Sequence, residues 1–165
     1  MDATNLAQIT INRSGLPLTK EGLRRGLAGP SIPSPAFLKI LRSPNLLPKT
    51  NLIEAFAKVS DHWNPHIAGQ VNDMHVKLVK LRGEFVWHHH QHEDEMFLVV
   101  KGNMLMKLRD GDVRIDEGEY IIVPRGVEHC PVAQSEAWVL LFEPASTLNT
   151  GNVKNERTVE NPSHL

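Results

Sequence analysis

The sequence has a single cysteine, almost no net charge and no long apolar run, and each shortage excludes a class of protein. Cys130 is the only cysteine among 165 residues, so no disulfide can close within the chain, and a reducing, cytoplasmic location is the simpler expectation. The formal net charge of -1 gives no electrostatic reason to expect a nucleic-acid or membrane partner. No apolar run approaches the roughly 20 residues that a membrane-spanning helix needs. The length and the 41% content of hydrophobic residues indicate a globular chain with one domain and a sizeable core.

The near-zero net charge conceals a difference between the two parts of the chain. Residues 1–50 contain seven Lys or Arg, two Asp or Glu and six of the eleven prolines, whereas residues 51–165 contain eleven basic and seventeen acidic residues. This composition predicts a basic, Pro-rich N-terminal extension over 1–50, with one short helix at 19–27. The extension weakly resembles an organellar transit peptide, but a lineage-specific extension or a start codon assigned too early is the favoured explanation.

From Asn51 onward the sequence has the pattern of a β-protein. Asn51 followed by Glu54 resembles a capping box and predicts a short helix over 52–59, after which 61–69 is interpreted as a loop. Apolar residues then recur with a period of two between Gly-bearing turns, and Asp110-Gly111 is typical of a tight hairpin. Strands are predicted at 76–81, 85–90, 96–101, 104–108, 113–115, 120–123 and 137–142. Short, regularly spaced strands favour an antiparallel sandwich or barrel over 51–146, followed by a polar tail over 147–165.

Histidines gather in one short segment, where four of the nine lie between residues 86 and 93. In a strand, alternate side chains share a face, so His88 and His90 can converge on one ion. Glu95 begins the next apolar segment, and His129 follows a turn of sequence Pro-Arg-Gly. Three imidazoles and one carboxylate suit Mn, Fe, Co, Ni, Cu or Zn, with coordination positions left for water or a ligand. Taken alone, such a histidine run is more often an exposed surface or an adventitious metal trap.

Two motifs make the sequence resemble the small, single-domain cupins. The first comprises His88, His90, Glu95 and Gly102, and the second comprises Gly118, Pro124, Gly126 and His129. Both occur in the cupin order and with the cupin internal spacings, over about 51–144. Gly83 departs from the pattern by lying one residue too close to His88, and Ala133 replaces the final Asn of the second motif.

The resemblance implies a fold and a metal site. The fold is an all-β, antiparallel double-stranded β-helix, the jelly-roll or cupin barrel, with a short helix before it. The site is one divalent transition metal per chain (Mn, Fe, Ni, Cu or Zn) held by His88, His90, Glu95 and His129. A shifted pair of His90 and His92 ranks behind, because it leaves only two residues before Glu95. Arg125, in the turn before His129, is a candidate contact for an anionic substrate and equally a solvated turn residue.

Cupins that resemble this chain have several functions, so two remain open. The first is a divalent-metal-dependent enzyme acting on a small polar molecule, either an oxidoreductase of the dioxygenase type or a sugar isomerase. The alternative is a non-catalytic module that binds a small ligand or a metal, with a purely structural metal as a third reading. The isomerase is the weaker association, since no dedicated phosphate-binding cluster is recognisable. Small cupins usually pair through their sheets, so a homodimer is expected, with no nucleic-acid or membrane partner.

Overall fold

The computed structural model describes residues 47–165. The predicted helix at 19–27 and nearly all of the predicted basic extension lie outside these residues. None of the helices in the described part combines the length and hydropathy required to cross a bilayer.

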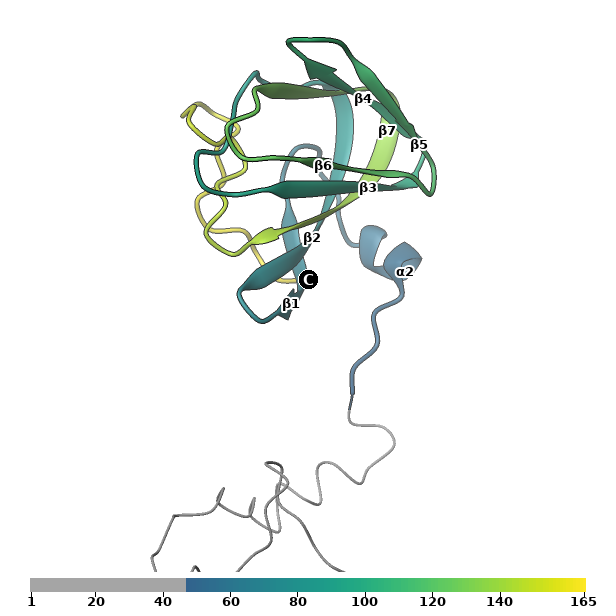
Figure 1. Ribbon diagram of the computed structural model, residues 1–165. Coiled ribbons are helices and arrows are strands. Elements are labelled where there is room, and N and C mark those ends of the chain that lie inside the picture. The colour runs from purple at the N-terminus through teal and green to yellow at the C-terminus, as the bar shows by residue number, and fades with distance from the viewer. Residues whose placement is uncertain (1–46) are drawn as a thin grey trace, which may run out of the picture. The chain divides into compact units, whose positions relative to one another are not determined.

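The described chain is almost entirely antiparallel β-structure, preceded by one short helix (Figure 1). The elements are α2 (Leu52–Phe56), β1 (His66–Val71), β2 (Met74–Glu84), β3 (Glu95–Lys101), β4 (Asn103–Leu108), β5 (Val113–Asp116), β6 (Tyr120–Val123) and β7 (His129–Pro144). Asn51 caps α2, because its Oδ1 accepts hydrogen bonds from the backbone N–H groups of Ile53 and Glu54. The predicted all-β cupin barrel with a short helix before it is confirmed.

Strand β7, at 16 residues the longest, organises the seven-stranded sheet. One of its edges pairs with β2 from Val132 to Pro144. The other edge pairs first with β4, starting at His129, and then with β3, ending at Phe142. The strand order is β1-β2-β7-β3-β6, with β4 between β7 and β5, so β1 and β6 are the ends of the main path. This arrangement places the first residue of β7 close to the segment that connects β2 to β3.

Two apolar clusters fill the two faces of the sheet. Inside the barrel, alternate residues of β2, β3 and β7, such as Val79, Val99 and Val139, pack against one another. On the outer face, α2 covers β2 through Phe56 and Leu78, and the Phe56 ring stacks on Trp138 with centroids 5.0 Å apart. Burying each such side chain contributes about 1.5–3 kcal/mol, so α2 is held by packing more than by its five residues of helix.

Two of the predicted strand assignments were wrong. Segment 61–69, interpreted as a loop, contains the start of β1, whose pairing with β2 includes a register shift between Ile67 and Gly69. Segment 85–90, predicted to be a strand, forms only an isolated bridge between His88 and His129. Pairing with β7 ends at Glu84, directly after Gly83, where a φ of +83° and a second register shift interrupt the ladder.

Residues 147–165, here named the C-terminal segment, pack against the barrel and form no strand of the sheet (yellow in Figure 1). Ile67 of β1 donates its N–H to the carbonyl of Ser163 and accepts a hydrogen bond from the N–H of Leu165. Nearer the start of the segment, the N–H of Asn152 donates to the carbonyl of His89. The C-terminal segment therefore connects β1 with the histidine-bearing segment between β2 and β3.

Candidate metal centre

Four side chains from three parts of the fold converge inside the barrel. His88 and His90 come from the extended segment before β3, Glu95 is the first residue of β3, and His129 is the first residue of β7. Paired backbone hydrogen bonds of 3.0 and 2.9 Å between His88 and His129 hold the two segments together. The residues are 2%, 4%, 3% and 0% exposed, in the order His88, His90, Glu95 and His129. One nitrogen or oxygen atom from each lies within 4.8 Å of all the others.

Hydrogen bonds to the backbone orient two of the imidazoles. Nδ1 of His88 lies 2.9 Å from the carbonyl oxygen of Val86, and Nδ1 of His129 lies 3.0 Å from that of Val127. If each Nδ1 carries the proton, the Nε2 lone pair is left for an ion. Nε2 of His129 is buried with no hydrogen-bond partner in the described structure, which is costly for a polar atom unless a ligand satisfies it.

Electrostatics keep His88 and Glu95 in the protonation states that a metal requires. Burial, reinforced by the nearby His129, lowers the pKa of His88 to about 4, so its imidazole is neutral at physiological pH. Burial raises the pKa of Glu95, but the adjacent imidazoles of His129 and His90 outweigh it and lower this pKa well below its ordinary value. Oε2 of Glu95 lies 3.1 Å from Nε2 of His90 and 3.5 Å from Nε2 of His129. A neutral His88 imidazole beside an ionised carboxylate fits a divalent transition metal.

A buried ion pair behind Glu95 was not recognised from the sequence. Lys77 of β2 and Glu143 of β7 are each 1% exposed, with Nζ and Oε1 2.7 Å apart, and Lys77 also donates to the carbonyl of Thr147 at 3.2 Å. Burial together with the charge of Glu95 raises the pKa of Glu143 well above its ordinary value. The alternation along β2 could have identified this pair from the sequence, because Lys77 occupies the same inward face as Val79.

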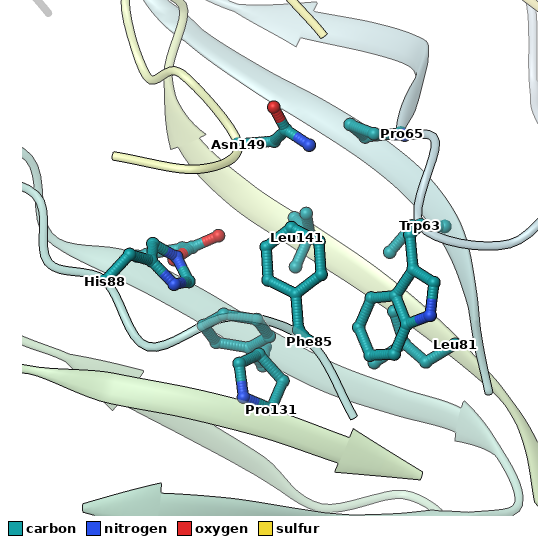
Figure 2. Close-up of a pocket in the computed structure, with 11 residues that line it drawn as sticks. Trp63, Pro65, Leu81, Phe85, His88, Pro131, Leu141 and Asn149 are labelled. Carbon is teal, nitrogen blue, oxygen red and sulfur yellow. The ribbon is translucent and has the colours of Figure 1, made fainter. Parts of the chain in front are cut away.

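A cavity opens beside His88 and Glu95, with an empty volume of ≈ 360 Å³ including its open mouth. The indole of Trp63 and the ring of Phe85 stack along one side of it, with centroids 4.8 Å apart and planes 21° apart. Figure 2 shows these rings on one side, His88 on the other, and Asn149 above. The remaining walls are apolar: Pro65, Val79, Leu81, Phe97, Pro131 and Leu141. The candidate metal site therefore adjoins a small, mainly apolar and aromatic pocket.

The other residues singled out from the sequence lie elsewhere. Arg125 is 62% exposed and binds Asp94 through Nε at 3.1 Å, and it does not line the cavity. His92 is exposed and does not belong to the converging group. Cys130, beside His129, is fully buried, and burial raises the pKa of its thiol to about 11.

Comparisons with known proteins agree with this fold. The Cupin_2 family, a cupin domain, matches residues 75–142. The uncharacterized protein YdbB of Bacillus subtilis (strain 168) is 30% identical over 80 residues, which are 48% of this chain and 71% of the relative. A solved cupin-2 domain containing protein from Shewanella frigidimarina is 39% identical, with a TM-score of 0.57 over 58% of this chain and 93% of its own. Protein NMB1881 from Neisseria meningitidis is 31% identical, with a TM-score of 0.56 over 59% of this chain and 100% of its own. The chain therefore belongs to the cupin family.

Proposed function

We propose that this cupin is a metal-dependent enzyme of the dioxygenase type, with one divalent transition metal held by His88, His90, Glu95 and His129. The observation that carries the proposal is the convergence of four buried donor groups beside a cavity that reaches solvent. A purely structural metal needs no adjoining cavity, whereas a catalytic metal requires a position open to substrate.

The lining of the cavity narrows the substrate class. Apart from His88, Glu95 and the Trp63 indole, Asn149 is the only lining residue with a polar side chain. A sugar would leave most of its hydroxyl groups without partners there, which disfavours the isomerase. The walls suit a small molecule with an oxygen-bearing end beside the metal ligands and an apolar body against Trp63 and Phe85.

The roles of the protein groups follow from their positions. When bound, a redox-active metal supplies an electrophilic centre at which oxygen-bearing groups and O2 can bind. The three imidazoles and Glu95 hold it, and the carbonyls of Val86 and Val127 fix the orientation of two of the rings. The aromatic wall orients the apolar part of the substrate and keeps water away from it.

A non-catalytic binding module is the alternative, and one observation favours it. Among residues 47–165, none that lines the cavity carries an acid or base side chain apart from the proposed ligands, so this part of the chain offers no independent group for proton transfer. A dioxygenase whose chemistry takes place at the metal is compatible with such a wall. An isomerase needs an acid or base side chain to transfer protons, and the wall does not supply one.

The first experiment is elemental analysis of untagged protein purified without chelator. We expect about one equivalent of Fe, Mn, Ni, Cu or Zn, lost in the His88→Ala/Glu95→Ala double variant. His92→Ala is the matched control, because it removes an exposed histidine of the same run and should leave the metal content unchanged. Equal loss in the control would indicate an adventitious surface site and contradict the proposal.

Catalysis is tested next with the protein loaded anaerobically with Fe(II). Oxygen uptake with an aromatic 1,2-diol, absent in the double variant, would support the dioxygenase. If a diol shifts the visible spectrum of the Co(II)-loaded protein but no oxygen is consumed, the binding module is favoured. Interconversion of an aldose phosphate and a ketose phosphate would favour the isomerase and overturn the preference stated above.

We also propose a homodimer that forms through the β6 edge. Tyr120 and Ile122 of this end strand are 63% and 55% exposed, and an apolar strand edge favours pairing with a second copy. Light scattering should give twice the chain mass of 18.5 kDa, and Ile122→Glu should give a monomer. Ile53→Glu, at a comparably exposed position on α2, is the control that should remain a dimer. A monomeric wild type would contradict the proposal; a cytoplasmic location stays a prediction.

A further inference from the structure

Arg157 of the C-terminal segment lies against the aromatic wall of the cavity. Its guanidinium carbon is 5.8 Å from the centroid of the Trp63 ring and 5.7 Å from that of Phe85. Nη1 donates a hydrogen bond of 2.7 Å to the backbone carbonyl of Glu84. Trp63 and Phe85 both line the cavity and Arg157 itself does not, so a positive charge borders a pocket whose walls are mainly apolar.

The C-terminal segment fixes the backbone on both sides of this arginine. Asn149, itself a lining residue, donates from Nδ2 to the carbonyl of Arg157 at 2.8 Å and accepts from the N–H of Val159 at 2.8 Å. The N–H of Arg157 donates to Oδ1 of Asn155 at 2.9 Å. Holding the backbone in this way reduces the conformational entropy that the arginine would lose on binding a ligand.

The guanidinium has no acidic partner within residues 47–165. No carboxylate of the described chain lies within 4.0 Å of it, and the carboxylate of the neighbouring Glu84 is 2.9 Å from Lys107. Arg109 and Arg125, by contrast, each form an ion pair with an acidic side chain. A guanidinium carries five N–H donors in a planar fork that matches a carboxylate, and only one of its atoms donates a hydrogen bond within the described chain.

We propose that Arg157 binds a carboxylate group of the ligand, so that the ligand is a small apolar or aromatic acid with metal-chelating oxygens at its other end. The assignment rests on the proposed metal-dependent function and names the substrate class of the same site. It transfers the anion-binding role that the sequence suggested for Arg125 to a residue beside the cavity. Asn149 is then a positioning residue, which acts by holding the backbone of Arg157.

The test compares two ligands that differ by one charge. The probes are 3-(3,4-dihydroxyphenyl)propanoate and its primary amide, and calorimetry measures their binding to the Zn(II)-loaded protein, which cannot turn them over. We expect the wild type to bind the carboxylate at least about tenfold more tightly than the amide, as a charge-assisted hydrogen bond provides. Arg157→Gln should abolish this preference and leave amide binding unchanged, while Arg157→Lys should retain part of it. The control Arg125→Gln should behave as the wild type.

Three results would overturn the assignment. In the first, Arg157→Gln weakens the binding of both ligands equally, which means that the arginine only covers the aromatic wall. In the second, the wild type shows no preference for the carboxylate, and in the third it binds neither probe. Failure of the dioxygenase proposal is distinguishable from all three, because it leaves the charge preference intact and abolishes only oxygen uptake by the Fe(II)-loaded protein.

Discussion

Replacing Gly151 by Ala should loosen the C-terminal segment from the metal centre. Gly151 has a φ of +51°, in the left-handed region that favours glycine. A Cβ at this position would overlap the carbonyl oxygen of His89 and approach Cδ2 of His88 to 3.2 Å. The obstacle is the backbone carbonyl of His89, which lies beside a proposed metal ligand, and a backbone group cannot rotate away as a flexible side chain can.

The magnitude follows from two contributions. The left-handed conformation costs a residue with a Cβ about 1–2 kcal/mol. Forcing a methyl group into occupied space adds about 1–3 kcal/mol. Gly118→Ala is the matched control, because Gly118 also has a positive φ, of +85°, but nothing lies within 4 Å of its added Cβ. Gly151→Ala should therefore lower the free energy of unfolding by about 1–3 kcal/mol more than Gly118→Ala does.

Urea unfolding of the metal-free proteins measures this difference, and amide hydrogen exchange locates it. The N–H of His89 donates to Oδ1 of Asn152 at 2.9 Å, and the N–H of Asn152 donates to the carbonyl of His89 at 3.1 Å. Both amides should lose protection in Gly151→Ala and keep it in Gly118→Ala. Equal unfolding energies, with both amides still protected, would refute the tight packing of Gly151 against the histidine segment.

Three further predictions concern buried ionisable groups. Lys77→Met should lower the free energy of unfolding of the metal-free protein by about 3–5 kcal/mol, because Glu143 loses its buried partner. Urea unfolding should show that the double variant Lys77→Met/Glu143→Leu recovers most of the lost stability. A double variant no more stable than the single one would contradict the reasoning. For His88, the folded pKa of about 4 lies below the ordinary 6.5, so between these values the unfolded chain binds a proton that the folded chain does not. Stability is thus lost as the pH falls from about 6.5 to 4, by up to about 1.4 kcal/mol per pH unit, and in urea titrations the metal-free His88→Gln protein should lack this contribution. Cys130 is fully buried, with its thiol pKa raised to about 11, so iodoacetamide at pH 8 should modify it only after unfolding; mass spectrometry that finds rapid labelling of the folded chain would refute its burial.

The sequence predicted the β-barrel from short-range alternation, whereas the grouping of the four side chains was implied by the resemblance of two motifs to those of the cupins. Alternation along each strand is set by chain geometry, and the spacing from His88 to Glu95 is a local property of one strand entry. The second motif fixes the turn before His129, and the jelly-roll pairing of β7 brings that turn to the first motif. The structure brings the four residues together.

What could not be predicted depends on contacts between distant parts of the chain. Strand β1 is held partly by Ser163 and Leu165, almost a hundred positions away, and no local pattern records such a partner. Hydrogen bonds between side chains and backbone, such as those of Asn149 and Asn155, order the C-terminal segment. Its sequence is therefore polar and has no apolar period from which structure could be predicted. The charge at Lys77 could have been flagged only once the inward face of β2 was known.

One part of the site lies within the match to the cupin family, and another part lies outside it. All four proposed ligands lie within the 75–142 match to the cupin family. Trp63, Asn149 and Arg157, which form or border the cavity wall, lie outside it. The part of the wall that comes from flanking segments can change without disturbing the donor group inside the barrel. Ligand choice in this protein is therefore expected to depend in part on residues 61–66 and 147–165, and a substrate known for another cupin would transfer only if that cupin has an equivalent wall.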